Sequence, residues 1–341
     1  MHKMKKIKEV FVSFLLENVG FLIFLVLLYI VLTFPVNYYI IIGGEISNVS
    51  SRIKVEDSYQ SKGSFNISYV KELQGTVMSY LLSNIIPSWD RKDMNNYKYD
   101  DSESIEDVKF RNNLDLKACN GYATYWAYTL ANKEVSLKSS NLYIISAISN
   151  KNSPLQVGDI LLSIDGKHYE TIDEYTDCIR SHKKDDILLV KVLRNQKEME
   201  LEVPLYEYGD TVYMGVILQY EKEYDTNPNV DITFERGISG PSGGLITTLE
   251  IYNQLTKKDL THGLKIAGTG TIEEDGRIGM IGGVKYKLLG AEAGGADVFL
   301  VPSGDNYQEA LKYKKKKHLK IKIIEVTNIE DAIQKVEKLK G

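Results

Sequence analysis

The segment "GISGPSGGLITTLEIY" (residues 237–252) places Ser242 among glycines and a proline and then runs into an apolar pattern with helical spacing. Pro241 suits the first turn of a helix, where its missing N–H is no loss. Ser242 is therefore predicted to lie where unpaired backbone N–H groups and the positive end of a helix dipole meet. Such a place favours a serine nucleophile and its anionic intermediate, and equally an ordinary capped helix.

A serine nucleophile needs a base, and the chain offers two kinds of candidate. His262, in "LTHGLK", is the histidine nearest to Ser242 in sequence, but no acidic motif completes a triad with it. Lys285 follows the double glycine of "IGGVKYKLLGAEAGG" and begins another helical pattern. Burial there would disfavour the charged form of the lysine and lower its pKa. The neutral amine could then take the serine proton and return it to the leaving amine.

Three ordered motifs, "GPSGG", "IAGTGTIEEDGRIGMIGGVKYKLLGA" and "GGADVFLVP", resemble the proteolytic domain of Lon-type serine proteases. The 43 residues from Ser242 to Lys285 match the spacing of that family's Ser–Lys dyad. The resemblance implies that these two residues are catalytic, and that Thr269, in "AGTGT", holds the Lys285 amine by hydrogen bonding. It also implies that Gly240 and Gly243 support the serine.

The serine motif departs from the family pattern at one position. The family commonly has alanine after the serine, where this chain has Gly243. Glycine lowers helix propensity by about 1 kcal/mol relative to alanine, but it removes no hydroxyl and no amine. We therefore expect it to be tolerated. The alternative is an inactive relative, in which Ser242 and Lys285 are capping and surface residues.

Residues 131–206 change to short strand patterns, with "LQVGDILLSIDGKHYETIDEY" at their centre, and resemble a PDZ domain. In such domains a peptide adds a strand to an exposed sheet edge. The sequence departs from the pattern at the carboxylate-binding loop, where "KSSNLYI" lacks the glycine-rich form, so capture of a free C-terminus is not predicted. The alternative is a small β-rich domain that serves as a spacer or lid.

The amino terminus pairs several lysines with an apolar stretch from Val10 to Leu32. About 23 helical residues reach roughly 34 Å, enough to cross the hydrocarbon core of a bilayer. The pattern predicts a cytoplasmic tail over 1–9, a transmembrane helix over 10–33 and an extracytoplasmic remainder, since basic residues stay inside. A cleaved signal peptide is the alternative.

The order of these segments resembles the membrane-anchored, PDZ-containing Lon-type endopeptidases of Gram-positive bacteria. The predicted fold class is α+β, with a transmembrane helix and a Lon-type proteolytic α/β domain that carries an inserted PDZ-like domain. We expect residues 34–130 to form the first part of the protease region, 131–206 the PDZ domain and 207–341 the Lon-type domain.

Composition excludes several classes of function. The net charge of −4 over 341 residues gives no electrostatic footprint for nucleic acid, and the two cysteines fit no metal-binding spacing. No phosphate-binding loop of the form GxxxxGK[ST] occurs, so no ATP-driven motor is predicted. We expect a cofactor-free endopeptidase that cuts peptides or flexible protein segments. The rival is a non-catalytic, membrane-tethered PDZ module. Substrate identity and oligomeric state stay open.

Overall fold

A computed structural model describes residues 13–100, 102–148, 153–233 and 240–340, and the chain divides into two compact units. The first unit comprises residues up to Gly43 together with Lys71–Tyr97, and the second comprises Gly44–Val70 and all residues from Lys98 onward. The first unit contains α2 (Val19–Thr33), α3 (Val77–Leu82), β4 (Asp90–Asp93) and the short 3-10 helix η1 (Met94–Tyr97). Two long strands, β1 (Pro35–Asn48) and β3 (Ser64–Thr76), contribute to both units.

The predicted transmembrane helix over 10–33 is not found. Within the described part of the chain, no helix combines the length and the apolar character needed to cross a membrane. The helix α2 has 15 residues, and it begins after Asn18, whose backbone is not helical. A helix of that length covers about 22 Å, less than the roughly 30 Å of a bilayer's hydrocarbon core. The predicted tail over 1–9 lies outside the described residues.

The second unit is built on a sheet with the strand order β15-β14-β13-β3-β1. Its strands β3, β13, β14 and β15 are parallel to one another. The pairing of β3 with β13 confirms that early strands share the sheet of the C-terminal segment, as the resemblance implied. The later strands are β13 (Lys265–Gly268), β14 (Val298–Pro302) and β15 (Lys322–Val326).

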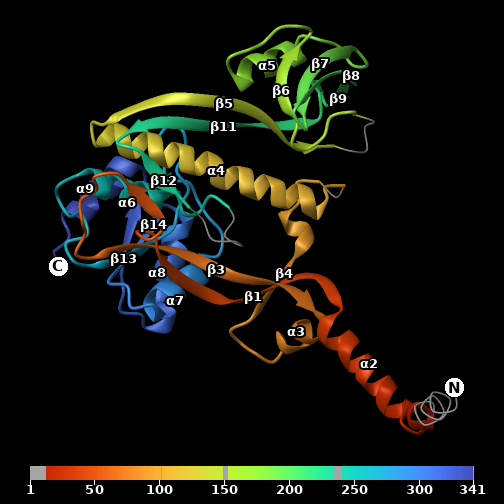
Figure 1. Ribbon diagram of the computed structural model, residues 1–341, viewed down its shortest axis with the longest axis vertical. Coiled ribbons are helices and arrows are strands. Elements are labelled where there is room, and N and C mark those ends of the chain that lie inside the picture. Colours follow the sequence, from red (N-terminus) through yellow and green to blue (C-terminus); the bar gives the residue numbers. More distant parts are fainter. Residues whose placement is uncertain (1–12, 101, 149–152, 234–239, 341) are drawn as a thin grey trace, which may run out of the picture. The chain divides into compact units, whose positions relative to one another are not determined.

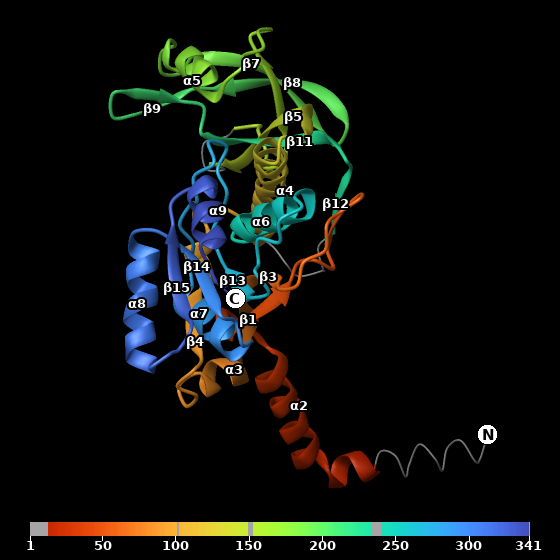
Figure 2. The same ribbon diagram turned by 90° about the vertical axis from the view of Figure 1, so that its left-hand side faces the viewer.

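Helices cover both faces of this sheet (Figure 2). Because side chains alternate along a strand, Val298 and Leu300 face one apolar core while Phe299 and Val301 face another. Both faces of β14 are buried, which explains its continuous apolar sequence. The first core contains α4 (Ile105–Leu130), α6 (Gly244–Leu255) and α9 (Ile329–Glu337). The second contains α7 (Val284–Ala293) and α8 (Asp305–Lys317).

A second sheet, with the strand order β11-β5-β6-β7-β8, forms the PDZ-like body. Its core packs α5 (Ile172–Arg180) against the sheet. The strands are β5 (Glu134–Ala147), β6 (Ile160–Ile164), β7 (Ile187–Arg194), β8 (Lys197–Pro204) and β11 (Val216–Asn227). A separate hairpin, β9 (Tyr206–Tyr208) and β10 (Thr211–Tyr213), precedes β11.

The interpretation of "KSSNLYI" as a counterpart of the carboxylate-binding loop is wrong. Its residues 138–144 lie inside β5, where they pair with β11. The strand β11 is one of the two edge strands of the sheet, and the segment that enters it ends at Gly215, whose φ of +78° suits glycine. The glycine-containing turn next to an open strand edge is therefore "YMGV", residues 213–216.

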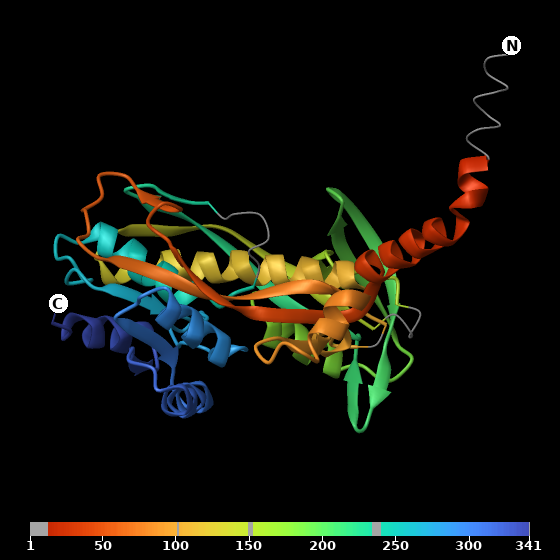
Figure 3. The same ribbon diagram turned by 90° about the horizontal axis from the view of Figure 1, so that it is seen from below.

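The 26-residue helix α4 connects the two sheets of the second unit. Ser104 begins it with a capping box, in which Ser104 and Asp107 each bond the other's backbone N–H. One side of α4 packs against α6, and another packs against β5 and β11 (Figures 1 and 3). The same rigid helix therefore touches the serine-bearing region and the PDZ-like sheet.

Candidate active site

Ser242 lies two residues before α6 and is half-buried, so the predicted position at a helix N-terminus is confirmed. The turn before it is fixed by Gly240, whose φ of +84° is a conformation that other residues adopt at a cost. The N–H of Gly240 donates a hydrogen bond to the carbonyl of Asn112 on α4 at 3.1 Å. Residues 234–239, including the first glycine of the motif, lie outside the described residues.

Close packing explains the two glycines that follow Ser242. A Cβ added to Gly243 would lie 2.9 Å from Cδ1 of Ile67, the end of a side chain on β3. A Cβ added to Gly244 would lie 2.3 Å from Sγ of Cys119 on α4 and 2.8 Å from the backbone nitrogen of Ile272. The Ile67 side chain thus occupies the space beside Gly243. At Gly244 the neighbours include backbone atoms, so glycine is required there.

Thr269 directly follows β13 and contacts the serine segment. Its side chain is fully buried, and its hydroxyl donates a hydrogen bond to the backbone carbonyl of Ser242 at 3.1 Å. The N–H of Gly270 donates to the same carbonyl at 2.9 Å. The resemblance placed Thr269 in the site, and the structure brings it against Ser242.

Thr269 contacts Lys287, two residues after the predicted Lys285. Nζ of Lys287 donates a hydrogen bond to Oγ1 of Thr269 at 3.0 Å. The Lys287 side chain is 4% exposed, and its backbone carbonyl accepts a hydrogen bond from Ser68 of β3. Lys285 is less buried, and its Nζ lies 4.5 Å from the ring centroid of Tyr286. Lys287 thus makes a hydrogen bond of the kind that the resemblance implied for Lys285, whose own role stays a prediction.

Helix geometry explains the difference between the two lysines. Residues two apart on an α-helix point about 200° apart, so one of them faces the sheet when the other faces away. Lys287 shares the buried face of α7 with Val284, Leu288 and Ala291. This periodicity was present in the sequence and could have identified Lys287, but the family spacing favoured Lys285.

His262, the alternative base, lies beyond the C-terminal end of α6, whereas Ser242 precedes its N-terminal end. The 12 residues of α6 separate the two ends by about 18 Å. A general base must come within hydrogen-bond reach of the proton it removes. The structure therefore does not bring His262 to Ser242.

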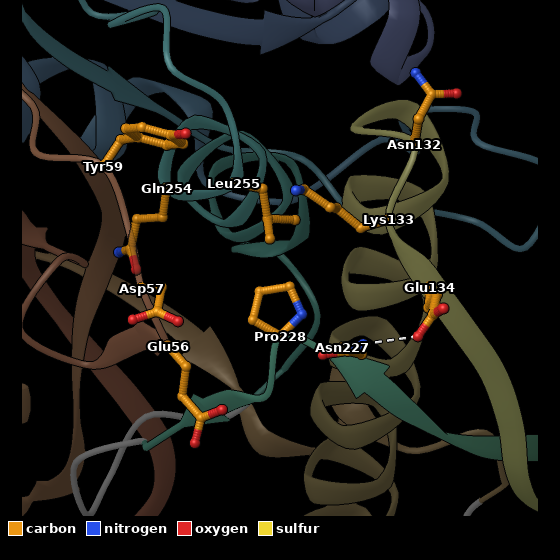
Figure 4. A pocket seen from close by; sticks show the side chains of 10 residues that line it. All are labelled: Glu56, Asp57, Tyr59, Asn132, Lys133, Glu134, Asn227, Pro228, Gln254 and Leu255. Atoms are coloured by element: carbon orange, nitrogen blue, oxygen red, sulfur yellow. Dashed lines mark hydrogen bonds between the residues drawn. The ribbon is translucent and has the colours of Figure 1, made fainter.

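Two pockets lie away from the serine. The first, of about 470 Å³, is polar and lies at the C-terminal end of α6, where Gln254 and Leu255 line it (Figure 4). Within it Asn227 donates a hydrogen bond to Glu134 at 2.7 Å. Its place at the far end of α6 separates it from Ser242. Among the described residues, no group of three His, Cys, Asp or Glu side chains could hold a metal ion.

The second pocket, of about 630 Å³, belongs to the PDZ-like body. It lies between the edge strand β11 and helix α5 and is also lined by the β9–β10 hairpin. Its lining is mainly apolar, with Ile172 and Ile179 from α5 and Val216–Leu218 from β11. An apolar groove beside an open strand edge suits an extended peptide, whose backbone can pair with the strand while its side chains enter the groove.

Comparisons with known proteins match two stretches of the chain. Residues 218–338 match the family model of the Lon protease (S16) C-terminal proteolytic domain, and residues 133–205 match that of the PDZ domain. Lon protease of Campylobacter concisus is 26% identical over 185 residues, 52% of this chain and 22% of that protein. Lon protease of Clostridium acetobutylicum is 29% identical over 132 residues, 38% of this chain and 16% of that protein. The chain thus spans less than a quarter of the length of these curated relatives.

Solved PDZ domains are also similar to part of the chain. The PDZ domain of an SdrC-like protein from Listeria monocytogenes is 22% identical and covers 24% of this chain and 92% of that structure, with a TM-score of 0.22. The corresponding domain from Listeria innocua is 25% identical and covers 23% and 92%, with a TM-score of 0.21. From its family matches, the chain carries a PDZ domain and a Lon protease-like proteolytic domain.

Proposed function

We propose that this protein is an ATP-independent serine endopeptidase in which Ser242 is the nucleophile and Lys287 is the general base. The observation that carries the proposal is the chain of contacts from the buried Lys287 amine to the Thr269 hydroxyl and on to the Ser242 backbone. It brings a lysine from α7 to the segment that holds the serine at the start of α6. Lys285, which the family spacing identified, is the alternative base.

In the proposed mechanism Lys287 enters the reaction as a neutral amine, because only the uncharged form can accept the serine proton. Oγ of Ser242 attacks the scissile carbonyl carbon while its proton moves to Nζ of Lys287. The resulting ammonium gives that proton to the leaving amine, and the peptide C–N bond breaks to leave an acyl ester on Ser242. Water then attacks the ester and gives a proton to Nζ, and the ammonium returns a proton to Oγ as the acid product leaves.

The surroundings of Ser242 suit the negative charge that develops on the carbonyl oxygen. The positive end of the α6 dipole lies at the serine turn, and dipoles aimed at a developing oxyanion stabilise the transition state. Thr269 fixes the Lys287 amine relative to the same turn. Preorganised groups of this kind need no rearrangement during the reaction.

The proposed substrates are extended peptides and flexible protein segments. The chain contains no GxxxxGK[ST] motif, so we propose that cleavage needs no ATP. The groove between β11 and α5 would hold a second part of the same substrate by adding it as a strand to the β11 edge. The PDZ domain would thereby recruit substrate to the protease.

Location outside the cytoplasm stays a prediction from the basic amino terminus. Protease added to intact cells should digest the chain after Ile46 if the prediction holds. Full protection of the chain until the membrane is opened would contradict it.

The proposed function is tested with the full chain and a library of internally quenched, unstructured peptides. Wild type should cleave members of the library at the same rate with and without ATP and magnesium, and Ser242→Ala should cleave none. Cleavage that persists in Ser242→Ala would overturn the assignment of the nucleophile. A wild-type protein that binds peptides in the β11–α5 groove but cuts none would favour the non-catalytic module.

A further inference from the structure

Cys119, on α4, contacts the turn that carries Ser242. Its side chain is 4% exposed, and Sγ donates a hydrogen bond to the backbone carbonyl of Pro241 at 3.1 Å. Pro241 directly precedes the serine. A thiol is a weak donor, but this one reaches a carbonyl one residue from the proposed nucleophile.

The same sulfur lies between two segments of the active site. A Cβ placed on Gly244 would be 2.3 Å from Sγ of Cys119 and 2.7 Å from Cγ2 of Ile272. Gly244 opens α6, and Ile272 lies three residues after Thr269, which contacts Lys287. Cys119 therefore packs where the segment of the nucleophile meets the segment that holds the base.

The chemistry of the thiol excludes a role as a nucleophile or metal ligand. Burial raises the pKa of the Cys119 thiol to about 12. The sulfur is therefore protonated at neutral pH, and only the thiolate is a good nucleophile or ligand. The protonated form is the one that can donate to Pro241.

The helix that carries Cys119 is itself fixed on both sides. The carbonyl of Asn112, two turns earlier, accepts the hydrogen bond of Gly240. Nε1 of Trp126, two turns later, donates to the carbonyl of Glu274 at 3.1 Å. At Gly121 the helix lies so close to the β11 carbonyl of Lys222 that an added Cβ would be 2.2 Å from its oxygen. Cys119 thus contacts the serine turn from a helix with little freedom to move.

We propose that Cys119 is a positioning residue for Ser242. Its S–H bond to Pro241, together with its contact at Gly244, limits the movement of the serine turn relative to the Thr269 segment. This inference rests on the proposed function, because it assigns Cys119 to the support of the Ser242–Lys287 dyad. A displacement of about 1 Å of a reacting group can lower a rate by up to a hundredfold.

The test compares three variants whose side chains separate volume from hydrogen bonding. Cys119→Val fills the space without a donor, Cys119→Ala removes both, and Cys119→Ser keeps a shorter donor. We expect kcat on an unstructured quenched peptide to fall by about tenfold or more in the valine and alanine variants, with KM within about twofold. Serine should restore kcat to within about threefold of wild type. Cys178→Ala, which changes the other cysteine, should keep wild-type kcat.

A role in packing alone predicts a different result. Cys119→Val would then keep the wild-type kcat while Cys119→Ala lost stability, and the proposal would be overturned. Normalising each rate to the folded fraction, measured by thermal unfolding, separates the two roles. If the valine and alanine variants do not fold, the serine variant still decides: a kcat below one-tenth of wild type at normal folding would contradict rescue by a donor.

Hydrogen exchange distinguishes failure of this inference from failure of the proposed function. Backbone amides of Gly240 and of residues 242–245 should exchange about tenfold faster in Cys119→Val than in wild type, as expected for a loosened local segment. This measurement needs no cleavage. Unchanged exchange would overturn the positioning role even if the protein is a protease, and faster exchange in a protein without activity would refute the proposed function alone.

Discussion

Lys287 and Thr269 form a buried pair in which the lysine amine donates a hydrogen bond to the threonine hydroxyl at 3.0 Å. The lysine comes from α7 and the threonine from the end of β13, so the pair joins a helix to the sheet. Thr269 in turn donates to the Ser242 carbonyl. Thr269 therefore links the proposed base to the segment that carries the proposed nucleophile.

The two lysines of α7 provide the sharpest test of the dyad. Lys287→Ala should lower kcat/KM by at least about a thousandfold, because nucleophile and base act as a unit. Lys285→Ala is the matched control, and we expect its kcat/KM to stay within about threefold of wild type. The measurement is cleavage of one quenched peptide by both variants at equal folded concentration. The reverse ranking would restore Lys285 as the base.

Thr269 can be tested by separating its hydroxyl from its shape. Thr269→Val removes the acceptor for Lys287 and the donor to Ser242 while keeping the size of the side chain. We expect kcat to fall on the order of tenfold to a hundredfold, as for a misplaced catalytic group. Thr269→Ser keeps the hydroxyl and should retain most of the activity. Activity that is kept in Thr269→Val and lost in Thr269→Ser would mean that the methyl group, and not the hydroxyl, is what matters.

The effect of replacing Gly243, which follows Ser242, should depend on Ile67, which packs against it. Gly243→Ala alone should be neutral or destabilising, because the new Cβ would lie 2.9 Å from Cδ1 of Ile67. Ile67→Val removes that carbon atom. In the Ile67→Val background we expect Gly243→Ala to stabilise the fold by up to about 1 kcal/mol, because alanine can adopt the φ of −95° found at this N-cap position and has less freedom in the unfolded chain.

A double-mutant cycle of unfolding free energies measures this coupling between Gly243 and Ile67. Additive effects of the two substitutions would show that Ile67 does not limit the side chain at position 243.

Part of the candidate site could be predicted from the sequence, and part of it could not. Ser242 and Thr269 lie as expected, since each directly adjoins its own element in a local motif. The choice between Lys285 and Lys287 depends on which face of α7 meets the sheet, and on this point the apolar periodicity of the helix and the family spacing favour different lysines. Cys119 contacts the turn that carries Ser242 and lies more than a hundred positions away from it in sequence. No local pattern links them.

The errors elsewhere also have physical causes. The apolar stretch near the amino terminus indicated a spanning helix, but helix breaks depend on backbone geometry, and α2 begins only at Val19. The segment "KSSNLYI" was predicted to correspond to the carboxylate-binding loop, but long-range pairing with β11 makes it part of a strand. Tertiary contacts decide the secondary structure of such segments.

A substitution in the groove between β11 and α5 should impair the cleavage of long substrates and leave that of short ones unchanged. Thr176 lines the groove from α5, so Thr176→Arg places a bulky charge in an apolar site. We expect KM for long peptides to rise by about tenfold or more, because an unpaired charge is poorly tolerated there. The kcat/KM of a peptide too short to reach both sites should not change. Asp177→Arg, at an exposed neighbouring position of α5, is the control. Equal effects on long and short peptides would contradict a recruiting role.

The last prediction concerns the pH dependence of stability and uses a buried carboxylate on α6. Burial raises the pKa of Glu250, although its carboxylate accepts a hydrogen bond from Gln254 at 2.6 Å. The unfolded chain therefore loses this proton at a lower pH than the folded protein does. Between those two values the folded state holds more protons, so Glu250 makes stability fall as pH rises.

Glu250→Gln removes this titration while keeping a similar shape and an acceptor for Gln254. The free energy of unfolding of the variant, relative to wild type, should thus increase as pH rises from 4 through the folded-state pKa, and it should then level off. Urea unfolding of both proteins from pH 4 to 8 measures the difference. Glu337→Gln, on the partly exposed side of α9, is the control and should show no such trend. A difference between Glu250→Gln and wild type that stays constant over this pH range would show that Glu250 is ionised alike in both states.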